Sequence, residues 1–238
     1  MNKPFTILAR MAAAGALIVF ASHAQGQNIS VGNLYQDSTG YRSENLNGNT
    51  TEGNEIVLAG SSAYDQITSF SFQFDYTGSS IVPAATADVT FYQNDGGYFD
   101  GTTYAAPGTQ IWTSGLFPLG GYTAGLTQNF YPADINGGAG VVVPQDFTWV
   151  VTFGGLQDGE SAGLALYSPA TVGANYGDAW VNNGSGWVLD TALAGNPPID
   201  FGAVFNGVAV VPEPSCSQLF ALSVLAGFGW IKRFQRRG

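Results

Sequence analysis

The sequence predicts an all-β protein: a single antiparallel β-sandwich or jelly roll, flanked by an N-terminal signal peptide and a C-terminal single transmembrane helix. Two observations predict the β fold. Aromatic and polar residues alternate strictly from residue 69 to residue 76, which places three Phe rings and Tyr76 on one face of a strand. No stretch of residues 25–210 has the apolar spacing of an amphipathic helix.

Further strands are expected where short apolar runs are separated by turn residues. Residues 147–153 repeat the alternation, and segments rich in Asn, Asp and Gly, such as residues 94–97 and 182–186, separate several runs. About ten short strands with one wet face each pack best as two antiparallel sheets or a jelly roll. The other expected strands are residues 29–35, 55–58, 87–92, 110–114, 127–131, 163–167, 179–182, 186–189 and 201–210.

The N-terminus has the three-part pattern of a secretory signal peptide. Two cations precede an apolar run over residues 11–21, and Ser22 and Ala24 place small residues at the two positions that a signal peptidase reads. A membrane-spanning helix is the alternative, but it needs about 20 apolar residues and this run is shorter. We expect cleavage after Ala24, so that residues 1–24 are the signal peptide and residues 25–210 the ectodomain.

The C-terminus combines a proline box, an apolar stretch and a basic end. The apolar stretch, as a helix, approaches the ~30 Å core of a bilayer if the basic residues snorkel. Because these cations follow the span, the tail should stay cytoplasmic while the ectodomain faces outward. A buried C-terminal helix is the alternative, which the flanking prolines and cations disfavour. The box is Val211-Pro212-Glu213-Pro214-Ser215, the expected transmembrane helix is residues 215–231, and the tail, residues 232–238, carries Lys232, Arg233, Arg236 and Arg237.

Residues 211–238 resemble the PEP-CTERM sorting signal of exported bacterial proteins in the order of these three parts. The resemblance covers only this tail. It implies cutting near the Pro-Glu-Pro box by an exosortase, a membrane transpeptidase-like enzyme, in bacteria that make extracellular polysaccharide and matrix. The same signature is also labelled an ice-binding-protein C-terminal domain, although the Thr residues here form no repeating array. Signal peptidase and exosortase are therefore the expected processing partners, and the tail does not say what the ectodomain binds.

The ectodomain lacks the residues of several kinds of active site. Its sixteen Asp and Glu against one Arg, Arg42, leave a formal charge of −15, which disfavours nucleic acid as a partner. His23 and Cys216 lie outside it, which excludes a Ser-His-Asp triad, a Cys nucleophile and a His- or Cys-ligated zinc. We expect a non-enzymatic structural or adhesive protein of the cell envelope or extracellular matrix. A weak glycosidase with two facing carboxylates is the enzymatic alternative.

An aromatic cluster late in the ectodomain suggests a polysaccharide-binding module as a second function. The rings of Tyr176, Trp180 and Trp187 could stack on sugars. Asp178 or Asn182 would accept the hydrogens of the sugar hydroxyls. The alternative is that both Trp rings fill the core from adjacent strands of a hairpin.

Acidic residues in Gly-rich loops could bind calcium, although no cofactor is required by any motif. The best set is Asn94, Asp95 and Asp100, because calcium prefers oxygen ligands on loops. Asp158 and Glu160 form a second set. Neither set follows the EF-hand pattern. The alternative is that Asp and Asn favour turns by bonding to nearby backbone.

Overall fold

The structure is a computed structural model that describes strands and their connections within residues 32–210. The predicted signal peptide, the sorting signal with its transmembrane helix, and the candidate residues Asp100 and Asp178 lie outside the described residues. Among the residues described, no helix is long and apolar enough to cross a membrane. The described ranges are 32–40, 43–44, 51–77, 85–97, 105–119, 127–167, 169–176, 179–190 and 200–210.

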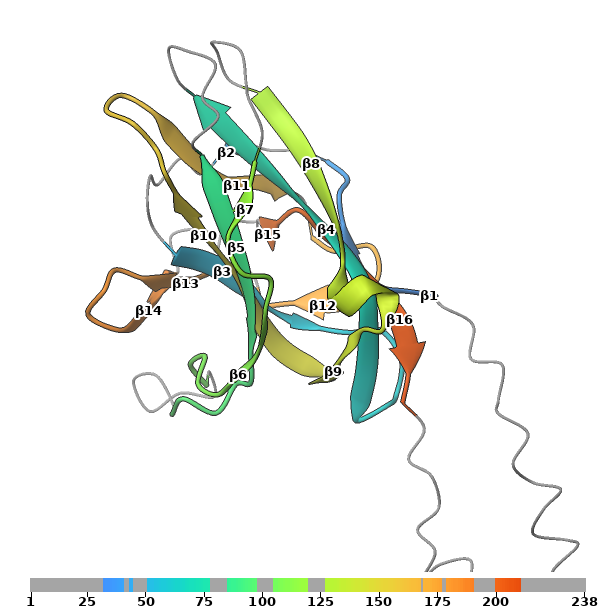
Figure 1. The fold of residues 1–238 in the computed structure, drawn as a ribbon. Coiled ribbons are helices and arrows are strands. Elements are labelled where there is room, and N and C mark those ends of the chain that lie inside the picture. The colour runs from blue at the N-terminus through green and yellow to red at the C-terminus, as the bar shows by residue number, and fades with distance from the viewer. Residues whose placement is uncertain are drawn as a thin grey trace, which may run out of the picture. The chain divides into compact units, whose positions relative to one another are not determined.

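The prediction of an all-β fold with two antiparallel sheets is confirmed, and Figure 1 shows the two sheets facing each other. The first sheet has the order β1-β16-β4-β11-β15, with β2 on β11 and both β8 and β9 on β4. Its strands are β1 (Gly32–Asp37), β2 (Ser43–Glu44), β4 (Tyr64–Thr77), β8 (Thr127–Asp134), β9 (Val141–Pro144), β11 (Ser161–Tyr167), β15 (Asp200–Phe201) and β16 (Ala203–Ala209).

The second sheet has the order β14-β13-β3-β10-β5-β6, with β12 on β3 and β7 on β5. A short 3-10 helix, η2 (Ile135–Gly138), joins β8 to β9 of the first sheet. The strands of the second sheet are β3 (Thr51–Val57), β5 (Thr86–Tyr92), β6 (Gln110–Thr113), β7 (Phe117–Pro118), β10 (Asp146–Gly154), β12 (Ala174–Asn175), β13 (Ala179–Asn182) and β14 (Trp187–Asp190).

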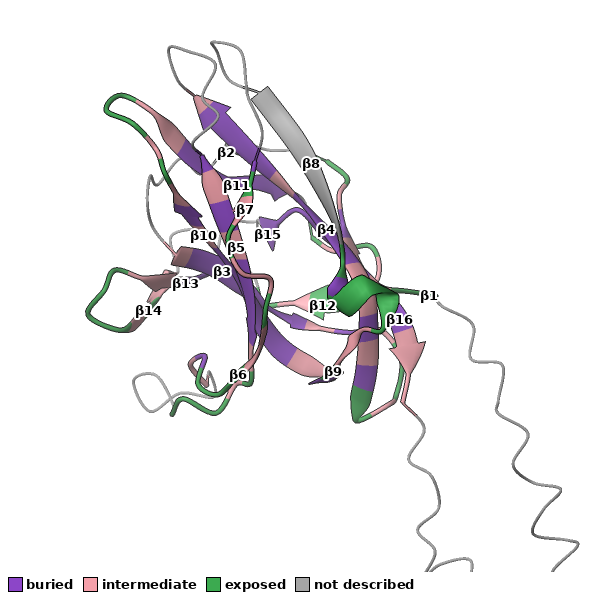
Figure 2. Cartoon of the chain, in the orientation of Figure 1, coloured by how far each residue is buried: buried purple, intermediate pink, exposed green. Residues whose placement is uncertain are grey.

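Aromatic rings from both sheets fill the space between them. The three Phe residues and Tyr76 that the alternation in β4 placed on one face are all buried. Phe205 of β16 stacks on Phe70 at 5.9 Å and meets Phe147 of β10 edge-on at 5.8 Å. Figure 2 shows the buried residues concentrated along β4, β10 and β5. Burial of large rings is the main stabilising contribution to this core.

Two strand boundaries differ from the predicted ones for identifiable reasons. β3 begins at Thr51, whereas the predicted strand begins at residue 55. The first half was missed because polar side chains, Glu52 and Asn54, occupy its buried positions. The predicted strand over residues 201–210 is two strands, β15 and β16, which Gly202 separates. The Gly202 N–H donates to the Ala165 carbonyl oxygen at 2.9 Å, and a Cβ on Gly202 would overlap the ring of Tyr167. A residue with a side chain could not make this close approach.

The first and last described strands lie side by side. Gly32 of β1 is opposite Gly207 of β16, and these strands are antiparallel. The N–H of Val210, the last described residue, donates to the carbonyl oxygen of Tyr64 at 3.1 Å. The chain therefore enters and leaves the described domain on neighbouring strands of one sheet, β1 on the side of the predicted signal peptide and β16 on the side of the predicted sorting signal.

Candidate functional site

Trp180, Asn182 and Trp187 of the predicted aromatic cluster lie on a hairpin of β13 and β14, and Tyr176 lies before it, but the two Trp rings differ in exposure. Trp180 is opposite Leu189, and Asn182 is opposite Trp187, so the two indoles are not directly across from each other. Trp180 is fully buried and offers no face to a sugar. Trp187 is partly exposed and meets Tyr92 of β5 edge-on, with ring centroids 5.5 Å apart. Of the three rings in the predicted cluster, those of Tyr176 and Trp187 are accessible to solvent.

Tyr176 belongs to a hydrogen-bond network on the second sheet. Its ring is 43% exposed, and its hydroxyl donates to Asp146 Oδ2 at 2.8 Å. The Asn94 amide donates to Asp146 Oδ1 at 2.7 Å and to Glu55 Oε1 at 2.9 Å. Thr148 Oγ1 donates to Asn94 Oδ1 at 2.7 Å. We call these five residues the tyrosine network.

Strand register explains why residues so far apart in the chain meet in the tyrosine network. Thr148 of β10 is directly opposite Glu55 of β3 on one side and Tyr92 of β5 on the other. Directly opposite residues of a sheet project on the same face. This row therefore places a carboxylate, a hydroxyl and an aromatic group on the face of the second sheet that turns away from the aromatic core, where Glu55 and Thr148 are themselves buried. The sequence prediction found Tyr176 and Asn94 separately and missed Glu55, Asp146 and Thr148, because each looks like an ordinary strand residue.

The geometry of the predicted calcium loops fits their structural alternative. Asn94 is engaged by three side chains of the tyrosine network. Asp95 Oδ1 accepts the Thr109 N–H at 2.6 Å and Asp95 Oδ2 accepts the Thr109 hydroxyl at 2.7 Å, which lowers the pKa of Asp95 below its ordinary value. In the second set, Glu160 Oε2 accepts the Gln157 N–H at 2.7 Å and closes a turn. Within the described ranges, no group of three or more His, Cys, Asp or Glu is placed to hold a metal ion, and no cofactor is indicated.

A second polar cluster lies inside the protein, where the sequence suggested nothing. Asn54 and Glu52 of β3 reach from the second sheet to the first. The Asn54 amide donates to Asp200 Oδ1 at 3.0 Å, and Glu52 Oε1 accepts the Leu164 N–H at 3.1 Å. Both carboxylates are fully buried. Polar side chains thus connect the two sheets beside the aromatic core.

Asp37, the last residue of β1, lies near Asp200, but its side chain makes no hydrogen bond to a described residue. It is fully buried, and within the described ranges neither of its carboxylate oxygens has a hydrogen-bond partner. Burial, together with the nearby charge of Asp200, raises the pKa of Asp37 to about 8. Burial and the same two carboxylates raise the pKa of Tyr35, whose hydroxyl accepts a hydrogen bond from Asn175 at 3.2 Å. We call Asp37, Asp200, Tyr35, Asn54 and Glu52 the buried acid cluster.

The buried acid cluster does not have the form of a glycosidase site. Such a site needs two carboxylates on either side of a bound sugar, about 5 to 9.5 Å apart. Asp37 and Asp200 are both fully buried, so a sugar chain cannot reach them in this structure.

Comparisons with known proteins return only distant structural similarity. No family model and no curated protein matches the chain. Among solved structures, the chain is similar to one titled "Structure of infectious bursal disease virus Gt strain", at 18% identity and a TM-score of 0.24, over 78% of this chain and 37% of that one. The T13 particle of the same virus gives 18% identity and a TM-score of 0.25, over 78% of this chain and 40% of that one. The chain therefore spans well under half the length of these viral chains.

Proposed function

We propose that the chain is an exported, non-enzymatic protein of the cell envelope or extracellular matrix, sorted by its PEP-CTERM-like tail. The observation that carries the proposal is the order of the tail: a Pro-Glu-Pro box, an apolar stretch and a basic end at residues 211–238. Signal peptidase and exosortase process the two ends, and the β-sandwich between them has a structural or adhesive role.

The fold supports this proposal through the position of its last strand. β16 lies between β1 and β4 in the first sheet, and backbone bonding continues to Val210, directly before the proline box. Pro212 and Pro214 restrict the backbone between the sandwich and the apolar stretch. The proposed anchor thus follows an inner strand of the first sheet within a few residues of sequence.

Truncation after residue 210 tests the sorting proposal. The full-length protein should fractionate with the cell envelope or the extracellular matrix, whereas the truncated protein should be released or misrouted. A chain whose residues 211–238 are scrambled is the matched control, because it keeps the composition and loses the order of the three parts. Unchanged fractionation of the truncated protein would contradict the proposal.

A second candidate function, polysaccharide binding, is favoured by one specific observation. Tyr176 is exposed, and its hydroxyl bonds to the partly exposed Asp146, which also accepts from the partly exposed Asn94. These polar groups can donate to and accept from sugar hydroxyls. The surrounding carboxylates would repel anionic polymers, which favours a neutral polysaccharide as the ligand.

Tyr176→Ala tests this second function on an array of neutral polysaccharides. Loss of one stacking ring should weaken binding by about tenfold, which corresponds to about 1.4 kcal/mol. Tyr64→Ala is the matched control, because Tyr64 is 52% exposed and lies on the first sheet. Equal binding by both variants, or no binding by the wild-type protein, would exclude this function for the tyrosine network.

A further inference from the structure

We propose that Asp37 holds a proton beside Asp200 at the contact between the two sheets, so that the domain loosens when its surroundings become alkaline. The bound species is the proton of the Asp37 carboxyl group, which would make the buried acid cluster a pH-sensitive junction.

Asp37 and Asp200 lie close to the contact between the two sheets. Asp37 ends β1 opposite Ala203 of β16, and Asp200 lies in β15 opposite Tyr167 of β11, so both belong to the first sheet. Asn54 of the second sheet donates to Asp200. Charge that develops on this pair therefore develops at the contact between the sheets.

The surroundings of Asp37 favour its protonated form. An ionised carboxylate without hydrogen bonds is far more costly to bury than a neutral carboxylic acid. Asp37 is fully buried and has no hydrogen-bond partner for either oxygen, so its environment favours the protonated form. A second carboxylate nearby strengthens this preference, because two like charges in a buried site rarely ionise together.

The neighbouring strands supply acidic groups and no cation. The described ranges contain no Lys, Arg or His, and Arg42 lies outside them. β16 presents the uncharged Ala203 and Phe205 on this side. The titratable groups that interact with Asp37 are Asp200 on β15, Tyr35 on β1 and Tyr167 on β11. Beyond them, Asp75 on β4 acts on Tyr167, and Glu52 on β3 accepts the Leu164 N–H. The carboxylates among them raise the pKa of Tyr35 and of Tyr167 as well.

The expected pH dependence follows from the pKa of Asp37 in the two states. An unfolded Asp loses its proton near pH 4, at a pKa of about 3.9. The folded protein keeps the proton up to a pKa of about 8. Between these values unfolding releases a proton, so the equilibrium constant for unfolding should rise by up to about tenfold per pH unit. The stabilisation is complete below pH 4 and lost above pH 8.

Urea unfolding of the full-length chain in a nonionic detergent, followed by Trp fluorescence from pH 5 to pH 9, tests the junction. The buried rings of Trp149 and Trp180 report on the folded state. Wild-type protein should unfold at progressively lower urea as the pH rises to about 8. Asp37→Asn should remove most of this slope and should resist more urea than wild type at pH 8, because an amide stays neutral. A flat wild-type profile, or an unchanged slope in Asp37→Asn, would overturn the proposal.

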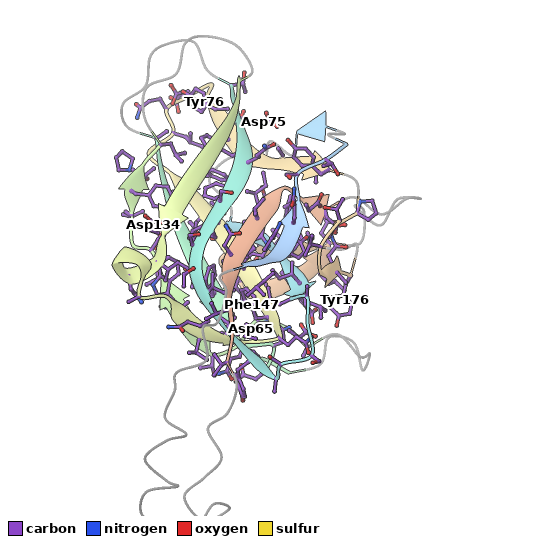
Figure 3. The ribbon with its side chains drawn as sticks, turned by 90° about the vertical axis from the view of Figure 1, so that its right-hand side faces the viewer. Asp65, Asp75, Tyr76, Asp134, Phe147 and Tyr176 are labelled. Carbon is purple, nitrogen blue, oxygen red and sulfur yellow. The ribbon has the colours of Figure 1, made fainter. Side chains whose placement is uncertain are left out.

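Asp65→Asn is the matched control for the burial of a carboxylate. Asp65 is buried, neither of its oxygens has a hydrogen-bond partner, and burial alone raises its pKa. It lies toward the opposite end of β4 from Asp75 (Figure 3). Because no second carboxylate acts on Asp65, its variant should keep most of the wild-type slope. Equal flattening in both variants would contradict the proposal, because it would show an effect of burial alone and not of the pairing of Asp37 with Asp200.

Infrared spectroscopy of the wild-type protein covers the case in which Asp37→Asn does not fold. The C=O stretch of a protonated carboxyl should be present at pH 6 and should disappear near pH 8. Absence of this band at pH 6 would contradict the proposal. Restoration of wild-type stability at pH 8 by added Ca²⁺ would contradict it too, because a cation would then neutralise the pair.

Discussion

Phe205→Ala should lower the free energy of unfolding by about 3 to 5 kcal/mol, the usual cost of deleting a large ring from a packed core. The ring of Phe205 is fully buried and contacts rings from both sheets. It stacks on Phe70 of the first sheet at 5.9 Å and meets Phe147 and Trp149 of the second sheet at 5.8 and 5.9 Å. A cavity there would remove contacts that hold the sheets together, as urea unfolding would show.

Leu116→Ala is the matched control for the loss of apolar volume. Leu116 is 74% exposed, so its truncation should change the free energy of unfolding by no more than about 0.5 kcal/mol. A loss below about 1 kcal/mol for Phe205→Ala would mean that the aromatic cluster does not hold the sheets together as the structure indicates.

Gly53→Ala should destabilise the second sheet by several kcal/mol or prevent folding, although it adds a single methyl group. Gly53 of β3 lies between Val150 of β10 and Trp180 of β13. A Cβ at this position would overlap the carbonyl oxygen of Trp149, which is backbone and cannot rotate away. The strands would have to separate, so the thermal unfolding midpoint should fall sharply.

Gly32→Ala separates this steric effect from the general cost of replacing glycine. No atom lies near the position of a Cβ on Gly32. Its thermal midpoint should therefore stay close to that of the wild-type protein. If Gly53→Ala unfolds at the same temperature as Gly32→Ala, the close approach of β3 to β10 is wrong.

The strand pattern was predictable wherever one face of a strand meets only apolar neighbours. β4 was found because its Phe residues repeat every second position. β3 was found only in its second half, because Glu52 and Asn54 occupy core-facing positions and reverse the expected order of apolar and polar residues. β15 and β16 were merged, because the contact between Gly202 and Tyr167 that separates them joins distant parts of the chain.

The candidate sites depended on contacts that no local pattern contains. Tyr176 meets Asp146 across 30 positions, and Asn54 meets Asp200 across 146 positions. Exposed aromatic residues and turn residues can be recognised from sequence as candidates for ligand binding. A buried carboxylate such as Asp37 cannot, because its sequence neighbours do not say which side chains will surround it after folding.

The intact mass of the mature protein recovered from the cell surface or matrix tests the sorting proposal most directly. We expect a chain that begins at residue 25 and ends near the Pro-Glu-Pro box, within residues 212–215, with any group that the sorting enzyme attaches. The apolar stretch and the basic tail should be absent. Recovery of surface protein whose mass still includes residues 216–238 would contradict processing by an exosortase.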